Sequence, residues 1–127
     1  MSRVTGIGGV FFRAANQRLM NQWYEKNLGL PLTPDGMAVF HWKEHGDPAK
    51  EQTTIWSTFP NDTEHFGESK QQFMINYIVD SLDEMLAQLR AAGATVDEHR
   101  EESEFGKFGW VYDPEGNRIE LWEPPTQ

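Results

Sequence analysis

The chain contains no cysteine, which excludes disulfides, thiolate–metal sites and a cysteine nucleophile. It also lacks an apolar run near the roughly 18 residues that a membrane span needs, and it does not begin with a charged and then apolar leader. We therefore expect a cytoplasmic protein with no membrane partner. Positive charge is scarce, since 11 Lys and Arg stand against 20 Asp and Glu for a net charge of −9. Because nucleic-acid binding needs clustered basic residues, no nucleic-acid partner is expected.

The 127 residues suit one domain, or two small modules that share a core. Aromatic content is high at 13%, with five Trp, which suits a sheet-rich core or an aromatic-lined pocket. Periodicity and turn signals predict strands at residues 4–13, 37–43, 51–59, 71–79, 95–102, 107–113 and 117–122, and helices at 17–27 and from 82 to about 92.

The order of these elements is similar in the two halves of the chain, as in an internal duplication. We therefore predict an α+β protein with a first module at residues 1–60, a polar linker at 61–70 and a second module at 71–127, together one domain. The residues at 98–104, rich in Glu, are expected to be a solvated strand end.

Helix boundaries carry clear signals. Asn16 is a predicted N-cap and Gly29 a predicted C-terminal stop, while Ser81 and Glu84 fit a reciprocal capping box. The apolar residues at helical spacing are expected to be core: Leu19, Met20 and Trp23 in the first helix, and Leu82, Met85, Leu86 and Leu89 in the second.

Residues 41–45 match H-x-x-E-H, an inverted zinc-peptidase signature. That mechanism needs a helix, whereas the alternation around His41 predicts a strand, in which His41 and His45 would lie about 13 Å apart. We expect this match to be coincidental. His65 and His99 lie in polar surroundings and are expected on the surface.

The stretch FGKFGWVYDPEGNRIELWEPP, residues 105–125, has the form of a β-hairpin. Alternation places Glu120 on one face with Arg118 and Trp122, and Ile119 and Leu121 on the other. Glu120 is thus the carboxylate expected to face a cavity, although pairing with a cation on a solvated face is the alternative. Asn76, flanked by apolar residues on a strand, needs a hydrogen-bond partner, either another strand or a ligand.

DPEGNRIELWEP, together with WYEKNLGL and VDSLDEMLAQLRAAGATV, resembles the vicinal oxygen chelate superfamily. That group includes glyoxalase I, bleomycin-resistance proteins and extradiol dioxygenases. The resemblance covers nearly the whole chain. It implies two βαβββ modules whose sheets curl into an open barrel around a cavity, and, since many members are homodimers, a homodimer.

Metal-binding members place four ligands in that cavity, and the resemblance puts them at Gly9, Trp56, Met74 and Glu120. Glycine has no side-chain ligand, an indole N–H only donates, and a thioether is too soft for Mg²⁺, Mn²⁺ or Ni²⁺. The register leaves room for a slip of one or two residues at Gly9 and Trp56. We expect no metal cofactor, with a divalent metal as the alternative.

Two hypotheses follow. The first is a metal-free, bleomycin-resistance-like protein that binds a small organic ligand in an aromatic-lined cavity. The second is an enzyme of the glyoxalase type, a lyase, isomerase or dioxygenase, with Glu120 as base or ligand. We favour binding. The expected site comprises Glu120 as its central, potentially catalytic residue, with Phe11, Trp56, Met74, Asn76, Trp110 and Arg118 as ligand-binding residues.

Overall fold

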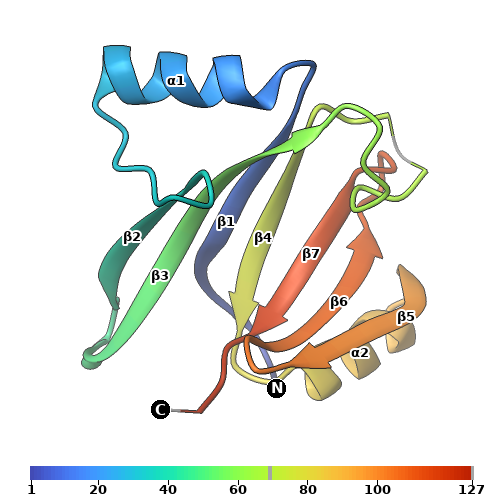
Figure 1. Cartoon of the computed structure of the whole chain (residues 1–127). Helices are drawn as coiled ribbons and strands as arrows, with labels where there is room; N and C mark the ends of the chain where they lie inside the picture. The colour runs from blue at the N-terminus through green and yellow to red at the C-terminus, as the bar shows by residue number, and fades with distance from the viewer. Residues whose placement is uncertain (69, 127) are drawn as a thin grey trace.

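The computed structural model describes residues 1–68 and 70–126, and it contains the expected strands and helices in the expected order (Figure 1). The elements are β1 (Val4–Ala14), α1 (Gln17–Leu28), β2 (Met37–Glu44), β3 (Asp47–Pro60), β4 (Phe73–Val79), α2 (Leu82–Ala91), β5 (Thr95–Ser103), β6 (Gly106–Tyr112) and β7 (Arg118–Glu123). Within the described ranges, neither helix is long and apolar enough to cross a membrane.

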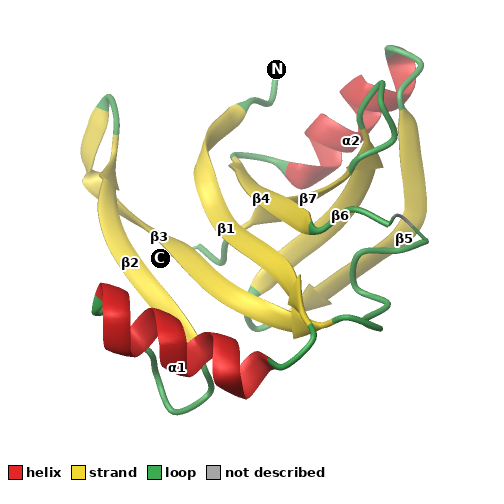
Figure 2. Cartoon of the chain, turned by 90° about the horizontal axis from the view of Figure 1, so that it is seen from above, coloured by secondary structure: helices red, strands yellow, loops and turns green. Residues whose placement is uncertain are grey.

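The strands form one seven-stranded sheet in the order β2-β3-β1-β4-β7-β6-β5. The sheet is mixed, since β1 pairs in parallel with β3 and β4 pairs in parallel with β7, while the other neighbours are antiparallel. Figure 2 shows it as a curved, open sheet, and β2 and β5 are its edges. The α+β class is confirmed. In the described part of the first half, an isolated bridge between Leu32 and Ala38 stands where the βαβββ pattern predicts a further strand.

Both helices pack on the same face of the sheet. In α2, Leu82, Met85 and Leu86 are buried as predicted, against a cluster that includes Val111 and Leu121. On the other side of the sheet, strand alternation places a second cluster made of Phe11, Phe66, Met74 and Trp110. We call this helix-free side, which also carries Asn76 and Glu120, the inner face.

The expectation that α1 contributes core residues is wrong. None of the side chains of α1 is buried among the described residues, and Leu19 and Trp23 are 63% and 52% exposed. The helix contacts the sheet mainly through β3, near one edge, so most of its apolar stripe has nothing to pack on. Tyr24 makes the principal ring contact, with Trp56 and Phe12.

The predicted caps are present, with one change. Asn16 Oδ1 accepts from the Leu19 amide at 3.0 Å, Gly29 has a φ of 67° beyond the end of α1, and Ser81 Oγ accepts from the Glu84 amide at 3.3 Å. The Ser81 amide, which the capping box assigns to Glu84, donates instead to the hydroxyl of Ser2 at 3.2 Å.

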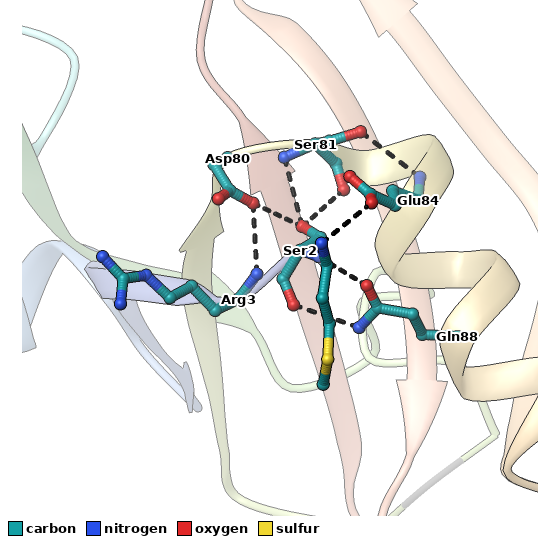
Figure 3. Close-up of polar contacts among 7 residues, drawn as sticks. Ser2, Arg3, Asp80, Ser81, Glu84 and Gln88 are labelled. Carbon is teal, nitrogen blue, oxygen red and sulfur yellow. Dashed lines mark hydrogen bonds and ion pairs between the residues drawn. The ribbon is translucent and has the colours of Figure 1, made fainter.

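Ser2 fastens the start of β1 to α2 (Figure 3). Its hydroxyl lies 2.5 Å from the Asp80 carboxylate, and its carbonyl accepts from the Gln88 amide group at 3.0 Å. The hydrogen bond from Ser2 lowers the pKa of Asp80 below its ordinary value. Met1 reaches Glu84 through its amino group at 3.2 Å. Side chains of one helix thus fix the first residues of a strand from the other half of the chain.

The glycines of β1 mark irregular backbone. The pairing of β1 with β4 shifts register between Val4 and Gly6 and again between Ile7 and Gly9. A Cβ on Gly8 would lie 2.4 Å from Asn76 Oδ1. Glycine at this position therefore lets the Asn76 side chain lie against the backbone of β1.

Candidate functional site

The carboxylate of Glu120 lies at the centre of the inner face. Glu120 is on β7, directly opposite Asn76 of β4 and Trp110 of β6. Asn76 Nδ2 donates to Oε1 at 2.6 Å and Trp110 Nε1 donates to Oε2 at 3.1 Å. Glu120 is only 2% exposed. Strand pairing therefore places two neutral donors on a buried carboxylate from both sides.

A third partner comes from outside the sheet. His65, in the segment between β3 and β4, places Nε2 at 2.8 Å from Glu120 Oε2. Because a carboxylate only accepts, this contact requires a proton on Nε2. The prediction that His65 lies on the surface in polar surroundings is right only in part, because its side chain is 31% exposed but its ring lies among aromatic side chains. The signal in the sequence was the apolar residue beside it, Phe66, which is fully buried and anchors the segment to the sheet.

Aromatic rings enclose the imidazole of His65. It stacks on Phe59 with ring centroids 5.0 Å apart and planes 2° apart. Phe11 and Trp110 present their rings at 68° and 90° to it, each with its centroid 6.2 Å away. These rings and the Glu120 carboxylate bound the space that the imidazole itself fills, which we call the recess.

Arg118 places a positive charge on the same face. Its Nη1 donates to Asp97 at 2.8 Å and to the Tyr112 hydroxyl at 2.7 Å, and its guanidinium lies 5.1 Å from the centroid of the Trp110 ring. The hydrogen bond from Arg118 is the main reason that the pKa of Asp97 lies below its ordinary value. Gly67 packs against the Arg118 side chain, so the segment that carries His65 also covers Arg118.

Two buried polar side-chain atoms in the described chain have no hydrogen-bond partner, Asn76 Oδ1 and Arg118 Nε. Both belong to residues on the inner face beside Glu120. Buried polar groups are normally paired, so each of these two atoms needs an explanation, such as a ligand or an ordered water.

The structure brings together six of the seven predicted site residues. Glu120 contacts Asn76 and Trp110, and the remaining members lie on the same face: Phe11, Met74 and Arg118.

Trp56 is the exception, and its predicted position facing Glu120 is wrong. It lies on the helix side of the sheet, with its ring centroid 5.3 Å from that of Phe12 and 4.9 Å from that of Tyr24. The neighbouring residue, Ile55, packs against the inner cluster instead. A slip of one residue moves every side chain of a strand to the other face, and the expected register was off by that one residue.

Side chains fill the predicted cavity. Phe66 and Met74 are fully buried over the inner face. A hollow of about 390 Å³ lies elsewhere, beside the C-terminal end of β7, where Asp80 and Glu123 are among its lining residues, and Glu120 is not one of them. Of the three side chains described as contacting Glu120, His65 is the partly exposed one, whereas Asn76 and Trp110 are buried.

The residues present do not fit the metal that the superfamily pattern implies. Gly9, Ile55 and Met74 provide no nitrogen or oxygen side-chain ligand near Glu120, and His65 and the amide oxygen of Asn76 are the added candidates. Protein sites for divalent metals usually supply three or four ligands. Over residues 1–68 and 70–126, no group of three or more His, Asp or Glu converges.

The other histidines do not contribute ligands to this site. His41 is on β2 as predicted, and His45 is in the turn that follows the strand, so the H-x-x-E-H match is not helical. His99 is exposed on β5, as predicted, and its ring stacks on Trp110 with centroids 5.4 Å apart.

Comparisons with known proteins agree with this fold. The chain is similar to a methylmalonyl-CoA epimerase from Mycobacterium tuberculosis, with 20% identity, a TM-score of 0.62, and coverage of 97% of this chain and 90% of that one. A methylmalonyl-CoA epimerase variant from Streptomyces coelicolor, in complex with 2-nitronate-propionyl-CoA, has 12% identity and a TM-score of 0.70, with coverage of 98% and 100%.

A glyoxalase/bleomycin resistance protein/dioxygenase superfamily member from Vibrio splendidus 12B01 has 13% identity and a TM-score of 0.57, with coverage of 97% and 99%. At these identities the structural likeness shows the fold alone. The comparison with curated protein sequences gave no match. The model of the Glyoxalase-like domain matches residues 9–122. The chain therefore belongs to the glyoxalase-like family of the vicinal oxygen chelate superfamily.

Proposed function

We propose that this protein binds a small organic molecule on the inner face of its sheet, with the Glu120 carboxylate as polar anchor and without a bound metal. The observation that carries the proposal is the burial of this carboxylate among aromatic rings on a face that no helix covers. A buried charge is a poor stabilising device, because well-packed apolar residues of similar volume often stabilise as much or more. The acidic group is better explained by recognition.

The surroundings of Glu120 favour a particular kind of ligand. Phe11, Phe59 and Trp110 offer ring surfaces for an apolar or aromatic body, and Glu120 accepts from an N–H or O–H group or pairs with a cation. The net charge of −9 disfavours large anions. A neutral or cationic molecule with a flat apolar part fits both features.

Thermal-shift screening of aromatic and cationic small molecules tests the proposal. Three proteins are compared: the wild type, Glu120→Gln, and the matched control Glu115→Gln, which changes an exposed carboxylate in the turn before β7. We expect a ligand that raises the Tm of the wild type and of the control but not of Glu120→Gln. Ligands that stabilise all three proteins equally would contradict the assignment of Glu120.

A second candidate is a proton-transfer enzyme of the glyoxalase or isomerase type. The pairing of His65 with Glu120 favours it, because a carboxylate that orients an imidazole is a common arrangement for acid–base chemistry. In that case the imidazole would take a proton from carbon while Glu120 holds the ring. The test is loss of the C2 proton signal of methylmalonyl-CoA in D₂O, the compound after which the structural neighbours are named. Proton exchange that the wild type catalyses and His65→Ala does not would favour the enzyme hypothesis. No exchange by the wild type would favour the binding hypothesis.

A further inference from the structure

The imidazole of His65 occupies the inner face in the manner of a bound ligand. It stacks on Phe59, is flanked edgewise by Phe11 and Trp110, and directs Nε2 at the one buried carboxylate of this cluster. We propose that this recess is a binding site for a flat nitrogen heterocycle that bears an N–H group, and that such a molecule binds by displacing the side chain of His65. This inference rests on the proposed binding function and names the chemical class of its ligand.

The ring contacts define the shape of the occupant. Stacking on Phe59 at nearly zero interplanar angle selects a planar ring, since a saturated ring cannot lie flat at the same distance. The edges of Phe11 and Trp110 limit the thickness of the recess. An aromatic ring is therefore favoured over an aliphatic one of equal size.

The polar contacts define its chemistry. Oε1 of Glu120 is held by Asn76, and Oε2 accepts from Trp110 and from His65. Departure of the imidazole leaves Oε2 with one donor and one open acceptor position inside an apolar recess. That position is filled well by an N–H donor, and a hydrogen bond to a carboxylate in such surroundings is among the stronger ones. A carboxylate ligand would be repelled.

Displacement requires little rearrangement of the backbone. Phe66, next to His65, is fully buried with Met74 and Trp110 and holds the segment in place. The His65 side chain is itself partly exposed, so rotation of this one side chain opens the recess to solvent. A ligand larger than imidazole extends outward through the same opening.

The test uses imidazole as the probe and the full chain with His65→Gly, which removes the resident ring. We expect imidazole to bind this variant with a millimolar Kd and to raise its Tm by about 5 °C at tenfold excess over Kd. The wild type, whose recess is filled, should show less than a third of this shift. The matched controls are neutral 1-methylimidazole, which has the ring but no N–H, and the double variant His65→Gly/Glu120→Gln. Neither the control compound with His65→Gly nor imidazole with the double variant should show the shift in Tm.

An absent imidazole shift in folded His65→Gly would overturn the inference, and so would equal shifts with neutral 1-methylimidazole or in the double variant. If His65→Gly does not fold, the imidazole shift is measured with His65→Ala instead. Titration of the wild type with benzimidazole gives a second readout, the position of the Trp110 indole N–H signal in NMR. Movement of that signal supports displacement, and no movement at saturating benzimidazole contradicts it.

The inference and the proposed function can be told apart. Ligands that bind in a Glu120-dependent way but lack a nitrogen ring, found together with no imidazole shift, would overturn the inference and support the proposed function. An imidazole shift in His65→Gly without any ligand for the wild type would overturn both, because no molecule would then displace His65.

Discussion

Asn76 on β4 donates across a parallel strand pair to Glu120 on β7, at 2.6 Å and from 44 positions earlier in the sequence. This bond fixes the orientation of the carboxylate, because it holds Oε1 and turns Oε2 toward Trp110 and His65. The amide is in turn seated against Gly8, where a larger residue would not fit. The recognition group of the proposed site is thus positioned by three neighbouring strands, β1, β4 and β7.

Replacement of Glu120 by Gln should leave the fold intact. The amide oxygen still accepts from Asn76 or Trp110, so we expect a loss of about 2 kcal/mol in the free energy of unfolding, measured by urea denaturation. Glu120→Leu leaves the donors of both residues unpaired and should cost about 1–3 kcal/mol more. A Glu120→Gln protein that does not fold would make Glu120 structural and remove the basis of the site.

Arg118 and Asp97 should stabilise the fold in a pH-dependent way. Arg118 lowers the pKa of Asp97 below its ordinary value of 3.8. The pair's contribution is therefore fully present above about pH 4–5 and is lost as the pH falls through the lowered pKa. Asp97→Asn should cost about 2 kcal/mol at pH 7, with a difference from wild type that is constant from pH 5 to 8 and shrinks below pH 4. Urea denaturation across this pH range measures the difference in the free energy of unfolding, with Glu115→Gln as control. A difference between the wild type and Asp97→Asn that grows as the pH falls would contradict the prediction.

Replacement of Gly8 by Ala should disturb the packing of Asn76 on β1 and so destabilise the protein. The added Cβ would lie 2.4 Å from Asn76 Oδ1 and 2.7 Å from the Trp122 ring, so the Asn76 amide must shift and its bond to Glu120 is disturbed. We expect a loss of about 1–3 kcal/mol by thermal or urea unfolding. Gly109→Ala, on β6, is the matched control: its nearest contact would be the flexible side chain of Leu86 at 3.3 Å, and its cost should be smaller. Equal costs would argue against the packing of Asn76 on β1.

Side-chain truncation should destabilise the protein much more in α2 than in α1. Leu86 in α2 is buried, and Leu86→Ala should cost about 2–4 kcal/mol because it leaves a cavity. Trp23 in α1 is about half exposed, and Trp23→Ala should cost no more than about 1 kcal/mol. Urea denaturation of both variants gives the comparison, and a loss for Trp23→Ala equal to that for Leu86→Ala would show that α1 is covered.

The sequence allowed most of the fold to be predicted, because its signals are local. Asn16, Gly29 and Ser81 act at the helix ends through contacts within a few residues, and alternation around Glu120 assigned the face of β7 correctly. Depth of burial was less predictable. The apolar stripe of α1 met the usual pattern for a core helix, but burial depends on what lies opposite, and α1 lies near a sheet edge.

The site itself was predicted in part for a related reason. Asn76, Trp110 and Glu120 are on strands whose alternation gives their face directly. Trp56 was misplaced by one residue, which in a strand is enough to change the face. His65 was missed because it lies in an irregular segment, where no periodicity indicates the direction of a side chain.

The indole N–H signal of Trp110 in a ¹H–¹⁵N NMR spectrum tests the central claim most directly, because that proton lies in the hydrogen bond to Glu120 Oε2. The signal is assigned with Trp110→Phe, and the spectrum is recorded with each small molecule that shifts the Tm of the wild type. The account predicts that these molecules move the Trp110 signal in the wild type and not in Glu120→Gln. Molecules that stabilise the wild type while the Trp110 signal stays unchanged would contradict it, because the ligand would then bind away from the inner face.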